Sequence, residues 1–494
     1  MPGPKRINRA AINGRAIFCG AAFLVGIGLT WVAERVGAPE GAVRALGGTF
    51  ALPALALIGL LARSSSLAHF FAGNRAVPQF YGGLAFAGAA AGLGVCLFAP
   101  ASASPLPLTG VALGLGFGAL LFGPAVRRAN ASALSDFLTI RLGAGPLRWP
   151  LGIVLLSTGA LVALAGYEAA LEALVERHVL ARSTGILVVG ATLALIVSPG
   201  GLASVLWSAA ACAGALLLAL ALPFIAQALA APGDPFAWLG AGGFGELASS
   251  VSSAPPALVL ASAIGVGALA LWAQPGVAAQ NGLNALRAGA AGVLLAGVAG
   301  MGAIAGALAM RGEAGPAVNG VVAGVEALAA IALAGCGLFS AVRAFSSATD
   351  ARISATRALA SQRLARARGA ALILVGLGGA LLRWRAFDPQ DALAAAVSLS
   401  LAFVAPVLGL TFSARATGAH GLACFLVSLA ALLALGASGG MPLAPAGWLA
   451  DALIAAALGF AAGWTASLFA PTPAPVKPDG VRDAYFELSD GPRP

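Results

Sequence analysis

Long apolar runs separated by short polar segments dominate the sequence. Many of these runs contain 18 or more residues, the length that crosses the hydrocarbon core of a bilayer as an α-helix. The pattern predicts about fourteen membrane-spanning helices and therefore an all-α integral membrane protein. The predicted spans are approximately 15–35, 46–62, 79–99, 107–126, 149–172, 183–198, 203–230, 256–274, 286–310, 318–343, 368–383, 391–412, 420–437 and 446–469.

The run from Pro78 to Pro100 is rich in glycine and carries no charge. Small residues suit close packing of helices in a membrane. They also suit local unwinding, which turns backbone carbonyls toward a bound solute or ion. We interpret this run as the pivot of a transporter core; the alternative is a tightly packed helix with no ligand. Its glycines are Gly82, Gly83, Gly88, Gly92 and Gly94.

The distribution of charge fits a membrane protein better than a nucleic-acid-binding one. Only 9% of the residues are charged, against roughly 25% in soluble domains. The net charge of +10 comes from basic residues gathered between apolar runs, the arrangement that orients membrane proteins. With both termini in the cytoplasm, three quarters of the 28 Lys and Arg residues face that side. We therefore expect the inner membrane of a bacterium, contact with lipid, and no nucleic-acid partner.

The sequence offers little support for an enzyme or a metalloprotein. No cluster of His, Asp and Glu and no pairing of a nucleophile with a base stands out, so we expect no enzymatic activity. The cysteines fall singly within apolar runs, which favours neither disulfides nor a zinc site. They are Cys19, Cys96, Cys212, Cys336 and Cys424.

Short motifs recur along the chain in the order of a known family. The segments are AHFFAGNRAVPQFYGGLAFAG (68–88), ALSDFLTIRLGAGPLR (133–148), SPGGLASVLW (198–207), AQPG (273–276), FSAVRAFSSATD (339–350) and FSARATGAHG (412–421). Asp136 and Arg141 hold the charged positions of the second motif. Together the segments resemble the sodium/solute symporter family, and most closely its cation/acetate symporter branch.

The resemblance implies a transporter core built as an inverted repeat of five plus five helices. Residues 79–230 would form the first repeat and 256–412 the second. The cytoplasmic N-terminus and an extra membrane helix would occupy 1–45, and a pre-core helix with a cytoplasmic loop 46–78. Two peripheral helices would occupy 413–470, before a disordered cytoplasmic tail over 471–494.

The resemblance also implies a secondary active transporter that couples a small organic solute to a cation. Sodium is the expected coupling ion, no other cofactor is expected, and a monocarboxylate such as acetate is the leading solute. The implied sodium ligands are the carbonyls of Gly88 and Ala91 and the hydroxyls of Ser346 and Ser347. Sodium is a hard cation that prefers such oxygen ligands. The alternative for both serines is a bond back to their own helix.

Two departures from the family pattern keep other functions open. The family places an Asp just after the position of Gly88, where this chain has Ala89, Ala90 and Ala91. Arg343 falls at or beside a third expected carbonyl ligand, where its guanidinium would act as an internal cation. Otherwise this side chain snorkels to the interface or pairs with Asp350. Sodium-independent or proton-coupled transport, and a transport-inactive sensor or scaffold, remain alternatives.

Glu326 is a carboxylate inside the predicted span 318–343. An intramembrane acid is costly and suggests a function, here as a proton carrier, unless it lies close to the outer interface. The fold implied by the resemblance places the solute near the middle of the membrane. Candidate lining residues there are Phe86, Tyr167, Trp272 and Gln274. The sequence does not indicate an oligomeric state.

Overall fold

The computed structural model describes residues 9–97, 106–143, 147–230, 255–309, 315–353, 360–413, 415–439 and 445–470. Within these ranges the elements are helices and no strand occurs, which confirms the predicted all-α class. The predicted disordered tail over 471–494 lies outside the described residues.

The helices follow the predicted spans closely. The first half contains α1 (Arg9–Arg35), α2 (Glu40–Thr49), α3 (Ala51–Leu61), α4 (Leu67–Ala72), η1 (Gly73–Arg75), α5 (Gln79–Leu97), α6 (Leu108–Phe117), η2 (Gly118–Phe122), α7 (Gly123–Arg128), α8 (Leu134–Leu142), α9 (Arg148–Glu176), α10 (Arg182–Gly200) and α11 (Leu202–Ala230). The second half contains α13 (Pro256–Gly267), η4 (Ala270–Ala273), α14 (Gln274–Ala278), α15 (Gly282–Ala309), α16 (Pro316–Ile353), α17 (Ala360–Trp384), α18 (Pro389–Leu399), η5 (Ser400–Val404), α19 (Ala405–Leu410), α20 (Gly418–Gly439) and α21 (Pro445–Phe469).

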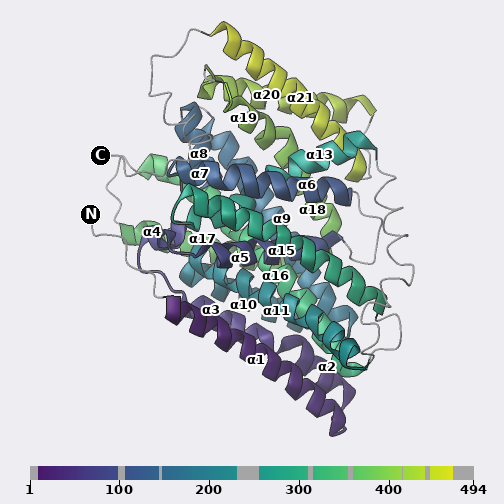
Figure 1. The fold of residues 1–494 in the computed structure, drawn as a ribbon. Coiled ribbons are helices and arrows are strands. Elements are labelled where there is room, and N and C mark those ends of the chain that lie inside the picture. Colours follow the sequence, from purple (N-terminus) through teal and green to yellow (C-terminus); the bar gives the residue numbers. More distant parts are fainter. Residues whose placement is uncertain are drawn as a thin grey trace.

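Each of the fourteen predicted spans coincides with one helix or with consecutive helices. Within the described ranges, twelve helices are long and apolar enough to cross a membrane, or up to thirteen if a bent pair of helices counts as one span. The division of 79–230 and 256–412 into inverted repeats stays a prediction. Figure 1 shows α1, α2 and α3 along one edge of the bundle and α20 and α21 along the opposite edge, with α5, α9, α15 and α16 between them.

Helix α5 lies at the centre of the bundle, packed against α11, α15 and α16. Its glycines allow these close contacts. A Cβ on Gly88 would lie 2.2 Å from the carbonyl oxygen of Ala209 on α11. A Cβ on Gly92 would lie 2.1 Å from the carbonyl oxygen of Ala329 on α16. The glycine-rich run is therefore a packing surface for neighbouring backbones.

The expected unwinding of this run is wrong, because α5 is an uninterrupted α-helix from Gln79 to Leu97. An apolar surrounding favours the helix, since every unwound peptide group would need another partner. The break occurs instead after α13, where Pro256–Gly267 and the following helical segment Ala270–Ala278 are bent by 51° across residues 268–269. Residues 256–274, predicted as one span, thus form a broken one.

Arginine side chains hold one end of the bundle together, and we call this the arginine-rich end. Arg75 donates to Asn130, Arg141 donates to the Thr411 carbonyl, and Arg148 donates to the Ser347 carbonyl. Guanidinium groups suit this role because they offer five donors in a fixed fork. These bonds join segments distant in sequence, and they surround the ends of α7, α8, α9, α16 and α19.

A matched pair of substitutions on α5 tests the packing role of its glycines. We expect Gly92→Leu to lower the midpoint of thermal unfolding in detergent, because the new side chain must displace the backbone of α16. Overpacking of this kind costs about 1–3 kcal/mol. Gly94→Leu is the control, because a Cβ there meets nothing within 4 Å. An equal effect of both substitutions would contradict the assignment.

Candidate functional site

The broken span is stabilised by an aromatic pair. The indole N–H of Trp272 donates to the carbonyl of Val266 over 2.8 Å, and the same carbonyl also accepts from the backbone N–H of Leu269 over 3.1 Å. The Trp272 ring lies 5.1 Å from that of Phe86 on α5, centroid to centroid. Both side chains are almost fully buried. Two of the predicted lining residues therefore contact each other, and they pack the break with apolar surface.

Gln274 connects the broken span to α16. Its amide nitrogen donates to the Cys336 carbonyl over 2.8 Å and to the Ser340 hydroxyl over 2.9 Å. A carbonyl only accepts, so the contact with Cys336 determines which amide atom is the nitrogen. The amide oxygen of Gln274 is buried and has no hydrogen-bond partner among the described residues. It is an oxygen available to a ligand.

A cavity of about 20 Å³ lies beside Gln274. A space of about 10–15 Å³ is enough for one water molecule. The cavity can therefore hold a water or a bare ion, but it is too small for an organic solute. Its polar lining residues are Ser132, Ser135, Gln274, Ser340 and Arg343.

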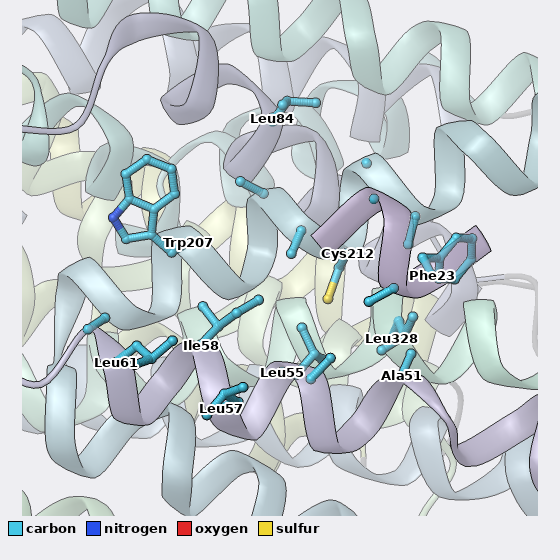
Figure 2. A pocket seen from close by; sticks show the side chains of 18 of the residues that line it. Phe23, Ala51, Leu55, Leu57, Ile58, Leu61, Leu84, Trp207, Cys212 and Leu328 are labelled. Atoms are coloured by element: carbon cyan, nitrogen blue, oxygen red, sulfur yellow. The ribbon is translucent and has the colours of Figure 1, made fainter. Parts of the chain in front are cut away.

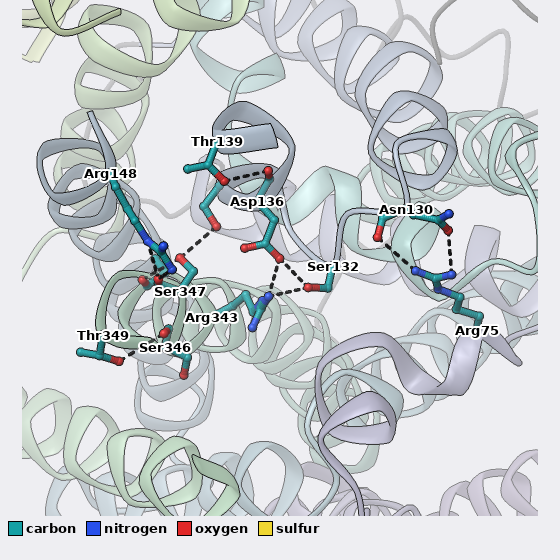
Figure 3. A network of polar contacts seen from close by, with 12 residues as sticks. Arg75, Asn130, Ser132, Asp136, Thr139, Arg148, Arg343, Ser346, Ser347 and Thr349 are labelled. Atoms are coloured by element: carbon teal, nitrogen blue, oxygen red, sulfur yellow. Dashed lines mark hydrogen bonds and ion pairs between the residues drawn. The ribbon is translucent and has the colours of Figure 1, made fainter. Parts of the chain in front are cut away.

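Arg343 lines this cavity, and we expect it to close the cavity toward the arginine-rich end. Its guanidinium forms an ion pair with Asp136 and also donates to Ser132, while Ser132 donates to Asp136 (Figure 3). The guanidinium carbon lies 4.4 Å from the ring centroid of Phe71 on α4. The Arg343 side chain is only 11% exposed, so the pair is shielded from solvent. One arginine thus ties α16 to α8 and α4.

The structure does not bring the four predicted sodium ligands together. Helix α5 meets α16 where Gly92 approaches Ala329 and Leu333. Ser346 is thirteen residues beyond Leu333, or about 20 Å along the helix at a rise of 1.5 Å per residue. Gly88 and Ala91 lie within a turn or so of Gly92, so the carbonyls and the hydroxyls are at different depths. The sodium site implied by the resemblance therefore stays a prediction: motifs supplied its residues, and the close approach at Gly92 indicates the register of the two helices.

The serine pair belongs to the arginine-rich end. The Ser347 hydroxyl donates to the Ser135 hydroxyl and to the Ala344 carbonyl, both over 3.1 Å. The Ser346 carbonyl accepts from Thr349 over 3.2 Å. Figure 3 shows both residues beside the Arg343 network. The serines therefore support the closure of this end, as partners of α8 and of their own helix.

Glu326 has a strong partner. Arg177, at the end of α9, donates to both carboxylate oxygens over 2.9 and 3.2 Å. Both side chains are 34% exposed. Buried or half-buried ion pairs of this geometry hold helices together, and losing one partner leaves an uncompensated charge. The isolated intramembrane carboxylate expected from the sequence is therefore a salt bridge between α16 and the end of α9.

Tyr167 faces a different set of helices from the other predicted lining residues. Its hydroxyl donates to the Ile186 carbonyl on α10 over 2.6 Å. Its ring lies beside Gly378 and Gly379 of α17. Tyr167 is absent from the lining of the cavity beside Gln274. Its place on α9 turns it toward α10 and α17, and its predicted role in lining a solute site stays a prediction.

Several polar residues of the site escaped the sequence analysis. Ser132, Ser135 and Ser340 are single hydroxyls in apolar or mixed surroundings, and nothing local distinguishes them from serines that bond their own helix. Asp136 carried a usable signal, because it holds a charged position in the 133–148 motif. Its pairing with Arg343, 207 residues away, needed the tertiary structure.

The fold has a counterpart among solved structures. No protein-family model matches the sequence, and no curated protein matches it. The substrate-bound, outward-open structure of a Na⁺-coupled sialic acid symporter superposes with a TM-score of 0.68 over 88% of this chain and 98% of that chain. The chain has the fold of that symporter. The sequence identity is 17%, so the likeness concerns the fold. The substrate and the ions of the symporter belong to that protein.

The closure by Arg343 can be tested by cysteine labelling. In a chain whose five native cysteines are replaced, Ser340→Cys would report access to the cavity. We expect Arg343→Gln to speed labelling by a membrane-impermeant thiol reagent about tenfold. A charged hydrogen bond contributes ~1.5–3 kcal/mol, and 1.4 kcal/mol corresponds to a tenfold change.

The control for this experiment removes an exposed ion pair. Arg44 pairs with Glu40, whose side chain is 72% exposed, far from the closed end in sequence. Arg44→Gln should leave the labelling rate of Ser340→Cys unchanged. An unchanged rate in Arg343→Gln, or the same increase in both variants, would show that the pair with Asp136 does not close the cavity.

Proposed function

We propose that the protein is a secondary transporter that moves a small organic solute across a membrane by alternating access, with sodium as the coupling ion. The observation that carries the proposal is the small polar cavity beside a broken span, in the fold of a Na⁺-coupled symporter. Broken helices offer free backbone groups and a place for a solute near the middle of the membrane. The motifs that resemble the sodium/solute symporters support the same class.

The arginine-rich end is proposed to face the cytoplasm. Positive charge accumulates on the cytoplasmic side of membrane proteins because basic segments resist translocation. Arg75, Arg127, Arg141, Arg148 and Arg343 all bond to side chains or carbonyls at this end. The inner membrane of a bacterium and cytoplasmic termini follow from this orientation. The cavity is then closed on the cytoplasmic side.

We propose a monocarboxylate such as acetate as the solute, with Arg343 as its partner. Arg343 borders the cavity, and its Nε is buried without a partner among the described residues. Guanidinium groups bind carboxylates through two parallel hydrogen bonds. A solute carboxylate would take the place of Asp136, and the release of α8 would open the cytoplasmic end. Binding and opening would then be linked through one side chain.

The cation site is proposed around the amide oxygen of Gln274. This buried oxygen and the neighbouring Ser340 hydroxyl are neutral oxygen ligands of the type that sodium prefers. The cavity beside them is large enough for a bare ion. Sodium here would lie near Arg343, whose charge Asp136 offsets while the pair is intact.

The position of Arg343 favours a second candidate function, sodium-independent transport. A fixed cation on the cavity wall would repel sodium whenever Asp136 leaves, and it would itself supply the positive charge that the solute needs. The two candidates differ in one measurable property, the response of uptake to a sodium gradient.

Uptake into proteoliposomes decides between them. We expect an inward sodium gradient to drive accumulation of labelled acetate, whereas an equal potassium gradient does not. Equal uptake with both cations would contradict sodium coupling and support the second candidate, sodium-independent transport. This holds whether or not the uptake also responds to a pH gradient. If neither acetate nor another monocarboxylate enters, the solute class is wrong and the sensor alternative gains support.

The role of Gln274 can be separated from its contribution to packing. We expect Gln274→Leu to raise the sodium concentration needed for half-maximal uptake about tenfold or more, because the variant has no amide oxygen; a 1.4 kcal/mol loss is sufficient for that change. Gln390→Leu is the matched control: Gln390 is also buried and donates to the Leu97 carbonyl, outside the cavity. Sodium dependence should be unchanged in that variant. Equal sodium dependence of Gln274→Leu and the parent protein would overturn the proposed cation site.

A further inference from the structure

A second, much larger cavity lies away from the polar site. Its volume is about 670 Å³, within the range of about 300–1,000 Å³ that ligand sites occupy. It is lined by α1, α3, α5 and α11, with single contributions from α4 and α16. It shares no lining residue with the cavity beside Gln274. Figure 2 shows Phe23, Leu55, Ile58 and Cys212 directed into it.

The lining is almost entirely apolar. Alanines and large aliphatic side chains make up most of it, and the described polar exceptions are few. A water molecule needs two to four polar partners to remain in a cavity, so this interior is unsuited to water. An apolar occupant would instead gain contact with side chains from four helices. The cavity therefore selects for hydrocarbon.

The dimensions of the cavity match one leaflet of a bilayer. The wall formed by α3 extends from Ala51 to Ala62, about 16 Å at 1.5 Å per residue. Half of a hydrocarbon core that is about 30 Å thick has nearly the same length. The segments Glu40–Leu61, Gln79–Leu97 and Leu202–Ala219, which form the walls, are each apolar and long enough to span a membrane. The cavity thus lies at the depth of acyl chains.

Polar and aromatic groups gather at one end of the cavity. Tyr81 and Trp207 lie there with ring centroids 5.0 Å apart, and such residues favour the membrane–water interface. Burial lowers the pKa of His69, so this imidazole is neutral at pH 7 and places no charge in the cavity. Arg63 follows the lining residue Ala62 and is exposed. The end that lies near the interface is therefore also the positively charged one.

We propose that this cavity binds one acyl chain of a phospholipid from the leaflet at the arginine-rich end, with the headgroup near Arg63. The chain would fill the space between the extra N-terminal helix α1 and the core helices α5 and α11. An anionic headgroup would be favoured, because Arg63, next to the lining residue Ala62, is an exposed positive charge. The bound lipid would connect α1 and α3 to the core, and this role does not depend on which solute is transported.

Two glycines allow the cavity to be filled without a clash. A Cβ built on Gly20 of α1 or on Gly214 of α11 meets nothing within 4 Å, although both residues line the cavity. A large side chain at Gly214 would therefore occupy the proposed acyl-chain space. Gly376, on the exposed face of α17, has the same open surroundings and lies outside the cavity, which makes it a matched control.

The experiment uses the full chain in nanodiscs of phosphatidylcholine that contain phosphatidylglycerol with a photoreactive group near the end of one acyl chain. After irradiation, cross-linked peptides are identified by mass spectrometry. We expect cross-links to concentrate on residues 51–62 and 203–218, to be lost in Gly214→Trp, and to persist in Gly376→Trp. If Gly214→Trp folds poorly, Ala54→Phe serves as the second variant, because it fills the cavity from the α3 wall. The cross-links should be lost in Ala54→Phe as well.

The outcomes that overturn the proposal are equally definite. Cross-links spread over all exposed helices, or unchanged in correctly folded Gly214→Trp and Ala54→Phe, would show that no acyl chain occupies the cavity. The headgroup is tested by comparing photoreactive phosphatidylglycerol with phosphatidylcholine. Arg63→Gln should reduce the yield of the anionic lipid alone. Equal yields of both lipids in the parent protein, unaffected by Arg63→Gln, would overturn the placement of the headgroup.

Discussion

The close approach of backbones along α5 is the constraint from which the rest of the structure follows. Gly88 and Gly92 bring α5 against the carbonyls of Ala209 and Ala329, at separations that a side chain would prevent. Within a membrane, helices gain little from burying apolar surface, so tight packing of small residues carries much of their association. These contacts determine how α5 lies against α11 and α16. They also explain why a glycine-rich segment remains helical in the centre of the bundle.

Charges in this protein are placed where a partner from another helix meets them. Arg343 pairs with Asp136, Arg177 with Glu326, and Arg182 with the fully buried Glu168. An unpaired charge at these positions would be expensive, and each pair joins residues of two different elements. The pair at Arg343 differs from the other two because it borders a cavity and a broken span. A pair that holds the bundle shut at such a position can also be the one that a solute opens.

The two cavities differ in the chemistry of their linings. The small one combines a buried amide oxygen, hydroxyls and a guanidinium, and its space is suited to a water or an ion. The large one is apolar and lies between the core and the helices that precede it. A polar interior suits solute and cation, whereas hydrocarbon suits the second space. Helix α1 thereby contributes a wall to the apolar cavity.

The sequence by itself determined the class of the protein and the places of its spans. Hydropathy is a local property, so runs such as 149–172 and 203–230 specify membrane helices without knowledge of their neighbours. The motif around Asp136 also identified a charged position that the structure places beside the cavity. Only the tertiary structure decided the rest: that α5 stays helical, that the break falls at residues 268–269, that Ser347 bonds to Ser135 on α8, and that Arg343 meets Asp136. The physical reason is that these outcomes depend on the register between helices. That register is set by close contacts such as the one at Gly92, which no stretch of sequence contains on its own.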